Sequence, residues 1–519
     1  MRAPQRPGTT RRGRDRRAEV ILPAPGRDRF TGEAPRTAVI GGGIAGLAAA
    51  TALAERGVRV TLYEREESLG GRLTGWRTRL ADGSEATMSR GFHAFFRQYY
   101  NLRGLLRRTD PGLTGLVPLP DYPLRHSGGL TDSFARVPRT PPWSALGFVA
   151  LSPTFGWRDL AAMDPRAALP LLDVRVPGVY ERFDGVSAQD FLHGIGFPEA
   201  AHHLAFEVFS RSFFADPREL SAAELLLMFH IYFLGSSEGL LFDVPREPFP
   251  QALWEPLGGY LERLGADVRT GTAVHGVRPV DGGGVEVETD GGTELHEAAV
   301  LALDVAGLRR VVATSPRLGT TAWRDDIARL RTAPPFLVSR LWLDRPVRAD
   351  RPGFLGTSGY EGLDNISVLD RWEGEAARWA RRTGGSVVEL HAYAVDPRRE
   401  RKEVQESLIT HLYTVYPETR DARIVDDRHE WRADCPLFPV GGHAHRPSVR
   451  TPHPQVMTAG DTVRCPLPVA LMERAATTGF LAANALLAGW GVRGQVLWTV
   501  PRAGRSAILR AVAGLTGPG

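Results

Sequence analysis

The sequence predicts an α/β fold: a discontinuous Rossmann-type domain with an inserted, mixed α+β domain that is rich in apolar residues. Three observations indicate this fold. A strand, a glycine-rich turn, a helix and a second strand follow one another over residues 37–64. Apolar blocks punctuated by proline occupy residues 101–256 and 313–450. After each block the chain returns to regular strand or helix patterns, so we expect separate segments to assemble the first domain.

Length and composition leave room for this arrangement. The 519 residues allow about two to four domains with a large core. With 43% hydrophobic and 24% charged residues the chain is typical of a globular protein, which excludes fibrous classes. The two cysteines, Cys435 and Cys465, exclude a disulfide scaffold and a four-cysteine metal cluster, and Cys465 is expected to be a buried, inert thiol. His443 and His445 lack a third ligand at a matching spacing, so we expect no metal site.

Positive charge is concentrated at the N-terminus. Residues 1–29 carry nine arginines against three acidic residues, whereas the net charge of the whole chain is +5, so the rest is close to neutral. We expect a basic, disordered arm over residues 1–35 and no nucleic-acid partner, because a neutral body offers no basic groove. No apolar run follows the arginines, which argues against an export signal and predicts a cytoplasmic protein. The longest uncharged run, residues 140–157, is broken by proline and glycine and does not predict a membrane-spanning helix.

The turn Gly41-x-Gly43-x-x-Gly46 predicts a dinucleotide site because it joins a strand, residues 37–40, to an alanine-rich helix, residues 47–56. The first glycine permits the tight turn, and the second lets the backbone approach a pyrophosphate at the helix N-terminus. The third allows the helix to pack closely on the strand. By itself this motif is only a weak indication of a dinucleotide site, but its position between a strand and a helix makes the indication strong.

An acidic residue and two further motifs indicate which dinucleotide is bound. Glu64 ends the second strand, residues 59–63, and is expected to bind the ribose hydroxyls, which disfavours NADP although Arg65 follows. Gly70-Gly71-Arg72 adds backbone N–H groups and a guanidinium for a longer diphosphate. Ala459-Gly460-Asp461 places a carboxylate for a ribityl chain. Because only the larger cofactor needs both motifs, the sequence predicts FAD.

These motifs also carry a family resemblance. The segments from Ala38 to Arg72 and from Ala459 to Gly479 resemble the two signatures of the FAD-dependent amine oxidase and carotene desaturase superfamily. The segment from Arg90 to Asn101 is similar to one in plant-type phytoene and ζ-carotene desaturases. Within that branch, the amino-acid sequence of this segment resembles that of the actinobacterial isorenieratene synthases, which are β-carotene desaturase/methylases. The resemblance implies an amine oxidase or phytoene desaturase-like fold, FAD as cofactor and an apolar carotenoid substrate.

The same resemblance implies how the chain is divided and which residues contact the cofactor. The expected division is an FAD-binding domain of residues 36–100, 257–312 and 451–490, a substrate domain of residues 101–256 and 313–450, and a basic C-terminal tail of residues 491–519. The backbone of Val274 is expected near the adenosine part of FAD, and Met472 near the flavin. The full set of expected cofactor-binding residues is Gly41, Gly43, Ala45, Gly46, Glu64, Arg65, Gly71, Arg72, Gly91, Val274, Gly460, Asp461 and Met472.

The implied reaction turns a cyclohexene ring with a gem-dimethyl carbon into a trimethylbenzene ring, with loss of four hydrogens and a 1,2-methyl shift. FAD accepts hydrides, while the protein must hold the ring, exclude water and supply a base. His93 is the candidate catalytic base because neutral imidazole accepts a proton near neutral pH. Arg90 is the second candidate catalytic residue. The resemblance implies that Arg90, Gly91 and His93 lie beside the isoalloxazine ring of FAD or at the inner end of a substrate tunnel. The aromatic residues of the segment 92–100 are either cation-stabilising or part of the core.

Three other functions remain open at this point. A linear carotene desaturase, or a carotene isomerase, of the same fold has the same motifs. A prenyl-lipid-binding protein that uses no flavin is disfavoured by the intact Glu64 and by the motifs around Arg72 and Asp461. A polar-amine oxidase is disfavoured by the apolar middle blocks. The electron acceptor, quinone or oxygen, is not determined by the sequence.

Peripheral contact with the cell membrane is expected because a carotenoid partitions into bilayers. Three segments are candidates for this contact: the loop 140–157, the apolar run 225–234 and the basic tail. In the tail, the residues at helix-like spacing are Ile508, Leu509, Val512 and Leu515. The first two segments are otherwise explained as interior lining.

Overall fold

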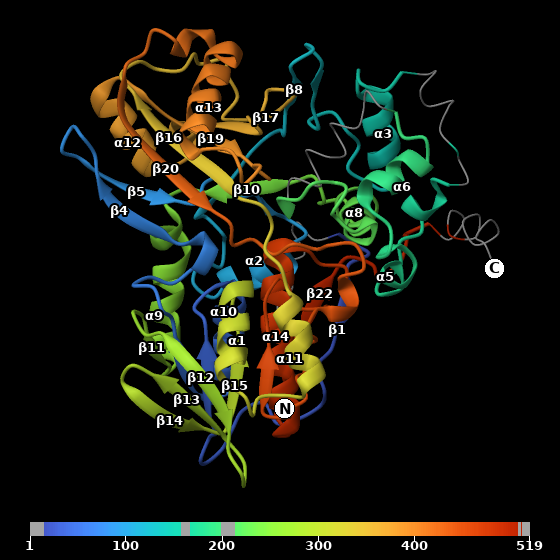
Figure 1. The fold of residues 1–519 in the computed structure, drawn as a ribbon, viewed down its shortest axis with the longest axis vertical. Helices are drawn as coiled ribbons and strands as arrows, with labels where there is room; N and C mark the ends of the chain where they lie inside the picture. The colour runs from blue at the N-terminus through green and yellow to red at the C-terminus, as the bar shows by residue number, and fades with distance from the viewer. Residues whose placement is uncertain (1–14, 157–163, 165–166, 199–212, 507–509, 511–519) are drawn as a thin grey trace, which may run out of the picture.

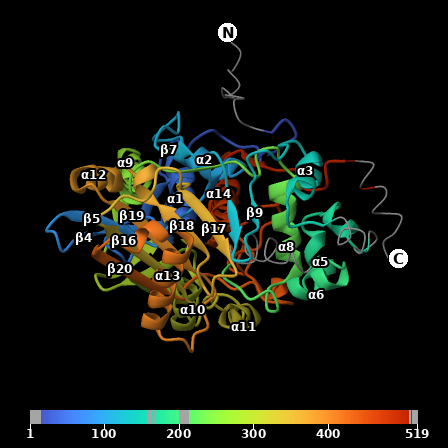
Figure 2. The same ribbon diagram turned by 90° about the horizontal axis from the view of Figure 1, so that it is seen from above.

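The computed structural model describes residues 15–156, 164, 167–198, 213–506 and 510. They form an elongated molecule of two halves, seen one above the other in Figure 1 and from above in Figure 2. The lower half of Figure 1 holds a parallel sheet with helices beside it, and the upper half holds a larger sheet and a group of helices. The predicted fold class is therefore confirmed.

A parallel sheet with the strand order β11-β3-β2-β15-β21 forms the centre of the lower half. Its strands are β2 (Arg36–Ile40), β3 (Arg59–Tyr63), β11 (Asp267–Arg269), β15 (Ala298–Leu301) and β21 (Val456–Thr458). Three distant stretches of sequence supply these strands, so the Rossmann-type domain is discontinuous. Every residue of β15 and β21 is buried, as expected for a parallel sheet that is covered on both faces.

Helices α1 (Ile44–Ala54) and α14 (Leu471–Gly489) pack on each other and on this sheet. All of α1 is buried. A Cβ on Gly479 would lie 2.2 Å from the carbonyl oxygen of Ala45, so the two backbones meet where α14 has no side chain. The other helices of this half are α2 (Tyr100–Leu106), α9 (Glu255–Arg263), α10 (Val305–Thr314) and α11 (Thr321–Arg329).

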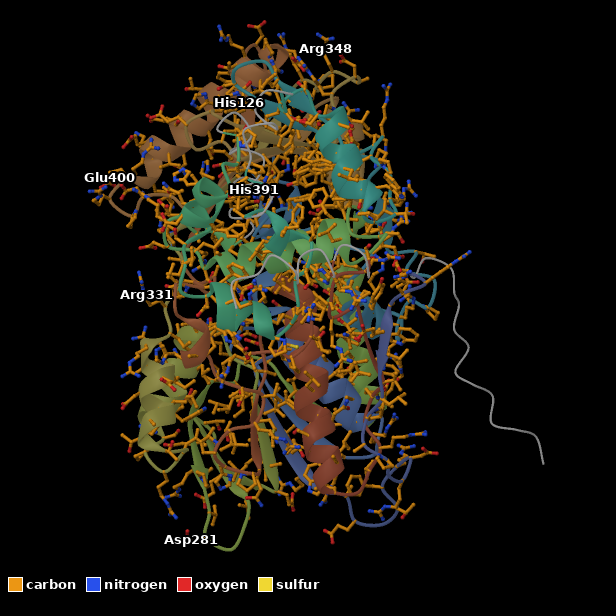
Figure 3. The ribbon with its side chains drawn as sticks, turned by 90° about the vertical axis from the view of Figure 1, so that its right-hand side faces the viewer. His126, Asp281, Arg331, Arg348, His391 and Glu400 are labelled. Carbon is orange, nitrogen blue, oxygen red and sulfur yellow. The ribbon has the colours of Figure 1, made fainter. Side chains whose placement is uncertain are left out.

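An antiparallel meander borders the parallel sheet. It consists of β12 (Val274–Pro279), β13 (Val285–Thr289) and β14 (Gly292–His296). Asp281 marks the tip of its first hairpin, at the bottom of Figure 3. The residues of β14 are mostly polar and exposed.

A seven-stranded sheet forms the upper half, with the order β20-β16-β19-β18-β17-β8-β9. Its strands are β8 (Leu124–His126), β9 (Thr131–Asp132), β16 (Phe336–Leu343), β17 (Phe354–Ser358), β18 (Asn365–Val368), β19 (Ser386–Ala392) and β20 (Ile424–Arg432). Helices α12 (Gly374–Thr383) and α13 (Arg401–Val415) lie at its outer side, at the upper left of Figure 1. The two halves are linked through β4 (Gly75–Arg79), β5 (Glu85–Ser89), β6 (Phe95–Phe96), β7 (Leu116–Pro118) and β10 (Phe242–Pro245). Every residue of β16 and β19 is buried, so this pair of strands belongs to the core of the upper half.

A group of helices completes the upper half at the right of Figure 1. Its helices are α3 (Trp143–Leu151), α5 (Gly178–Phe183), α6 (Ala188–Gly194) and α8 (Ala222–Phe229), and the π-helix η6 (His230–Leu234) continues α8. The segment 140–157, expected as a loop, contains α3 instead. The run 225–234 is buried except for the half-buried Phe229, so its expected contact with lipid is wrong. Among the described residues, no helix is long and apolar enough to cross a membrane.

Two segments near opposite ends of the sequence pair in a small sheet. Strand β1 (Glu19–Ile21) pairs antiparallel with β22 (Leu497–Thr499), and the ring of Phe30 packs edge-on against Trp490 at 6.0 Å. The expectation of a disordered arm is therefore wrong for residues 15–35, because apolar and hydrogen-bonding groups fix them. Residues 1–14 and the four apolar residues of the predicted helical spacing, Ile508, Leu509, Val512 and Leu515, lie outside the described residues. The other predicted domain boundaries stay predictions.

Candidate active site

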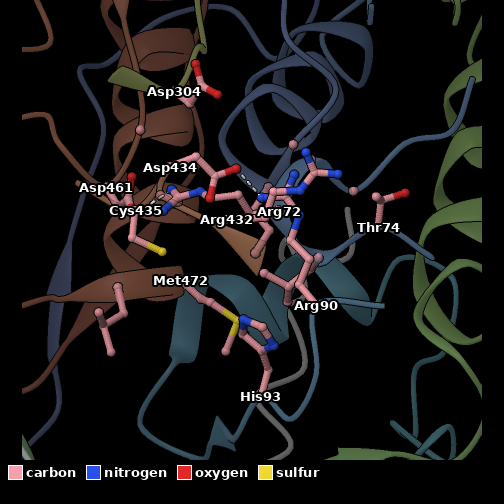
Figure 4. A pocket seen from close by; sticks show the side chains of 18 of the residues that line it. Arg72, Thr74, Arg90, His93, Asp304, Arg432, Asp434, Cys435, Asp461 and Met472 are labelled. Atoms are coloured by element: carbon pink, nitrogen blue, oxygen red, sulfur yellow. Dashed lines mark hydrogen bonds and ion pairs between the residues drawn. The ribbon is translucent and has the colours of Figure 1, made fainter. Parts of the chain in front are cut away.

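A cavity of about 1120 Å³ extends from the parallel sheet into the upper half of the molecule. Its lower end lies at the carboxyl ends of β2, β3, β15 and β21, the position at which open α/β sheets bind ligands. Most residues predicted to bind the cofactor line it, namely Gly41, Gly43, Ala45, Glu64, Arg65, Gly71, Arg72, Val274, Gly460, Asp461 and Met472, as do Arg90 and His93. Gly46 and Gly91 do not. Figure 4 shows the part of the cavity between these polar groups and His93.

The glycine turn leaves the N-terminus of α1 open to an anion. Gly41 has a φ of 109°, and a Cβ there would lie 2.3 Å from the carbonyl oxygen of Ala302. A Cβ on Gly46 would lie 1.8 Å from the carbonyl oxygen of Gly41, so Gly46 packs the helix onto the turn and faces away from the cavity. Gly43 is the N-cap of α1, and neither a side-chain cap nor an acidic residue occupies the first turn. This geometry fits a pyrophosphate bound by backbone N–H groups.

The carboxylate of Glu64 is fixed at the end of β3. Its oxygens accept hydrogen bonds from the backbone N–H of Gly42 at 2.7 Å and of Glu66 at 2.9 Å. Burial raises the pKa of Glu64, while the two N–H groups act in the opposite direction. The side chain lines the cavity beside the turn, where it fits a ribose. Arg65 is bound by Glu66 at 3.0 Å and lies 3.8 Å from Asp304 at the exposed rim.

Arg72 and Asp461 join the two motifs that were expected to distinguish FAD. The guanidinium of Arg72 donates to the carboxylate of Asp461 at 2.7 Å. Only Nη2 of Arg72 is shown to donate to this carboxylate, and Arg72 also lines the cavity, so its expected contact with the diphosphate stays a prediction. Gly460, directly before Asp461, adopts a φ of 146°, a backbone conformation that favours glycine.

His93 is a neutral imidazole in the wall of the cavity. Its Nδ1 lies 2.9 Å from the carbonyl oxygen of Gly91, so Nδ1–H donates and Nε2 retains a lone pair. Burial lowers the pKa of His93 to about 4, although the bond to Gly91 acts in the opposite direction. His93 and Met472 both point into the same part of the cavity (Figure 4). A neutral side chain with a free lone pair is suited to accept a proton.

Arg90 and Gly91 have supporting places in the structure. Arg90 forms an ion pair with Asp434, which follows β20. Gly91 has a φ of 86°, and a Cβ there would lie 2.3 Å from Cε1 of His391. The His391 ring therefore fills the space that a Gly91 side chain would need, and the expected contact of Gly91 with the cofactor stays a prediction.

Sequence reasoning missed the residues that reach the cavity from the upper sheet. Asp434 and Cys435 lie beside Arg72 and Arg90 (Figure 4), but hundreds of residues separate them in the chain and no local motif marks them. Burial raises the pKa of the Cys435 thiol to about 11, so it is not a thiolate. Other missed residues that line the upper part include Asp364, Asn365, Tyr393, Trp431 and Arg432.

Aromatic side chains form the upper wall of the cavity. Phe92 stacks on Phe354 at 4.3 Å, and Tyr122 lies 4.7 Å from the same ring. Of the aromatic residues in the segment 92–100, Phe92, Phe96 and Tyr99 line the cavity, while Phe95 and Tyr100 are buried in the core. The upper part therefore suits an apolar, conjugated ligand.

The remaining candidates from the sequence lie away from this chemistry. His443 stacks on Tyr180 at 3.7 Å, and His445 lies 2.8 Å from Asp326. Within the described part of the chain, no group of three or more metal-binding side chains is present. Burial raises the pKa of the Cys465 thiol to about 11, and Cys465 does not line this cavity.

The open helix N-terminus, the fixed Glu64 and the paired Arg72 and Asp461 fit FAD, and together with the fold they define an FAD-dependent oxidoreductase. The family model described as flavin containing amine oxidoreductase matches residues 44–487. The chain belongs to this family, and FAD is its cofactor.

Individual proteins are also similar to the chain. A carotenoid phi-ring synthase of Streptomyces griseus is 74% identical over 97% of this chain and 98% of its own length. A carotenoid phi-ring synthase of Chlorobaculum tepidum is 28% identical over 90% of this chain and 91% of its own length. Among solved structures, wild-type putrescine oxidase bound to putrescine has a TM-score of 0.66 at 16% identity, over 88% of this chain and 99% of that one. At this identity the last likeness concerns the fold alone.

Proposed function

We propose that the protein converts the β-ionone rings of β-carotene into aromatic rings by desaturation with a 1,2-methyl shift. The observation that carries the proposal is the 74% identity, over nearly the full length, to a protein named carotenoid phi-ring synthase. The cavity supports it because a polar end for FAD continues into an aromatic wall. A linear carotene desaturase or isomerase is the second candidate, since the residues that fit FAD do not discriminate between carotenoids.

The side chains of the cavity supply what the reaction needs besides the cofactor. FAD, when bound, accepts the hydrides. The stacked aromatic rings of Phe92 and Phe354 line the cavity and exclude water from a positively charged ring. Nε2 of His93 accepts a proton, since burial keeps this imidazole neutral. Each aromatised ring loses four hydrogens as two hydrides and two protons, so the site must accept two protons per ring.

We further propose that the protein works at the cytoplasmic surface of the cell membrane and contacts it through α3. Trp143, Leu146 and Leu151 of this helix are 63%, 57% and 55% exposed. On its opposite face Phe148 stacks at 4.7 Å on Phe134, which lines the cavity. The exposed Arg136 and Arg139 precede the helix and suit an anionic surface. A carotenoid would thus enter from the bilayer beside α3, and a quinone or oxygen would reoxidise the cofactor.

The test is expression in cells that accumulate β-carotene, followed by chromatography and mass analysis of the pigments. The proposal predicts the loss of four hydrogens per ring with an unchanged number of carbons, and no such change with the variant Glu64→Ala. A parallel strain that accumulates ζ-carotene tests the second candidate. Unchanged β-carotene together with newly coloured linear products would overturn the proposal in favour of a linear carotene desaturase.

A further inference from the structure

A buried hydrogen-bonded chain runs from the upper wall of the cavity into the large sheet. The hydroxyl of Tyr393 lies 2.8 Å from Nδ1 of His391, and Nε2 of His391 lies 2.9 Å from a carboxylate oxygen of Glu389. Arg340 donates to the other oxygen of Glu389 at 2.7 and 2.9 Å. His391, Glu389 and Arg340 are 1%, 0% and 3% exposed. Figure 3 shows His391 inside the outline of the upper half.

The charges fix the direction in which this chain moves a proton. Burial opposes ionisation of Glu389, but Arg340 and His391 hold the pKa of this carboxyl at about 2, so Glu389 is a carboxylate. Glu389 therefore accepts from Nε2–H of His391 at 2.9 Å. The backbone N–H of Phe92 lies farther from the same Nε2 atom, at 3.4 Å. Nδ1 of His391 then accepts from the hydroxyl of Tyr393. A proton that leaves Tyr393 thus passes inward, toward a negative charge.

The cavity end of the chain is an acceptor site in an aromatic wall. Tyr393 and Asn365 both line the cavity, and the ring of Phe214 lies edge-on to Tyr393 at 4.8 Å. Asn365 donates to the Tyr393 hydroxyl at 2.9 Å. Its own carbonyl oxygen has no hydrogen-bond partner among the described residues, although Asn365 is only 3% exposed. A neutral hydrocarbon offers nothing to these oxygens, whereas a positively charged ring is stabilised by them.

We propose that Tyr393 is a catalytic residue that takes one of the two protons each ring must lose, with His391 and Glu389 as positioning residues behind it. This inference rests on the proposed function. A ring C–H bond of the cationic ring breaks, and its electron pair remains in the ring as a new double bond. The proton goes to the Tyr393 oxygen as the hydroxyl proton passes to Nδ1 of His391, and Glu389 balances the imidazolium charge. His93 lies on the other side of Gly91 and is left for the second proton.

The proposed proton transfer can proceed with a base as weak as the Tyr393 hydroxyl. A cyclohexadienyl cation gives up a proton readily because aromaticity is gained, so a neutral phenol backed by an imidazole and a carboxylate is sufficient. Without Tyr393 the same cation loses a proton from another carbon, which gives ring isomers that are not aromatic. The identity of the products therefore reports on Tyr393 separately from the overall rate.

The experiment compares wild type with Tyr393→Phe and His391→Gln, and uses Tyr360→Phe as the matched control. Tyr360 is a buried tyrosine of the same domain that does not line the cavity. FAD per chain and thermal stability are measured first. We expect Tyr393→Phe to retain both, to lower the yield of aromatic rings from β-carotene by about 100-fold or more, and to accumulate non-aromatic ring isomers.

A binding measurement gives a readout that does not depend on turnover. The probe is a polyene amine with a protonated nitrogen in the ring, a mimic of the cationic ring. We expect Tyr393→Phe to weaken binding of this amine about tenfold or more while binding of β-carotene is unchanged. Aromatic rings formed by Tyr393→Phe at the wild-type yield, or equal losses in Tyr360→Phe, would overturn the role of Tyr393. Absence of aromatic rings with wild type would instead refute the proposed function, and the amine measurement would still test the acceptor site.

Discussion

The guanidinium of Arg72 donates a 2.7 Å hydrogen bond to the carboxylate of Asp461, although 389 residues separate them in the sequence. The loop after β3 and the loop after β21 are thereby held together at the carboxyl ends of one parallel sheet. Each loop belongs to a motif that indicates FAD. The ion pair therefore fixes the geometry of the cofactor end of the cavity.

Removal of this ion pair is predicted to weaken FAD binding. In Arg72→Ala the carboxylate of Asp461 loses a charge-assisted hydrogen bond, and we expect FAD affinity to fall about tenfold or more. The measurement is the flavin absorbance per chain after gel filtration. Arg77→Ala is the control, since Arg77 pairs with Glu85 on the surface at 2.9 Å. Full flavin occupancy in Arg72→Ala at low FAD concentration would contradict the account.

The contact between α1 and α14 is predicted to tolerate no side chain at one glycine of α14. In Gly479→Ala the new Cβ meets the carbonyl oxygen of Ala45, and we expect the free energy of unfolding to fall by about 1–3 kcal/mol. Gly489→Ala is the matched control in the same helix, with no atom within 4 Å of its Cβ. It should be neutral or stabilising by about 0.5–1 kcal/mol. Equal stabilities of the two variants in urea titrations would show that the helices do not touch there.

Acid is predicted to destabilise the folded protein through His93. The pKa of this imidazole is about 4 in the folded state against about 6.5 when unfolded, so between these pH values the unfolded chain binds more protons. The stability that His93 retains above pH 6.5 is thus lost progressively as the pH falls toward 4. The free energy of unfolding of His93→Gln minus that of wild type should increase by about 1–2 kcal/mol when the pH is lowered from 7.5 to 5. Urea unfolding of both proteins at the two pH values tests this, and a difference that does not change with pH would contradict it.

The exposed face of α3 is predicted to bind lipid. The double variant Trp143→Ser, Leu146→Ser removes two large apolar side chains, each of which contributes about 1.5–3 kcal/mol when buried. We expect binding to vesicles with anionic lipids to fall about tenfold or more in a flotation assay. Leu295→Ser is the control, because this leucine is 53% exposed on β14 in the other half of the molecule. Equal binding of the double variant and the control would exclude α3 as the contact.

Local patterns in the sequence were sufficient for the cofactor end of the molecule. The strand, turn and helix around Gly41 and Gly46 were predicted because the glycine spacing and the apolar residues of the strand and the helix lie within a short stretch of sequence. The pairing of β1 with β22 could not be predicted because it joins two segments near opposite ends of the sequence. The exposed face of α3 could not be predicted for a different reason. This helix is apolar on all sides and follows two prolines, so its sequence shows no amphipathic pattern.

Most residues at the substrate end of the site could not be predicted from the sequence. Tyr393, His391 and Glu389 alternate along one buried strand and its end, which is the pattern of any strand with some polar residues. Their role depends on Arg340 from the neighbouring strand and on the cavity in front of Tyr393, which only the tertiary structure supplies. His93 was found because it stands in a segment that resembles a known family, and its neutral state became apparent only from its burial.

The central claim, ring aromatisation with a methyl shift, is tested most directly with β-carotene that carries ¹³C in its gem-dimethyl groups. The purified holoenzyme is incubated with this substrate, and the ring products are analysed by NMR. The account predicts that one labelled methyl group of each pair is bonded to the neighbouring carbon of an aromatic ring, with no carbon lost. Labelled methyl groups that remain together on one carbon, or that leave the molecule, would contradict it.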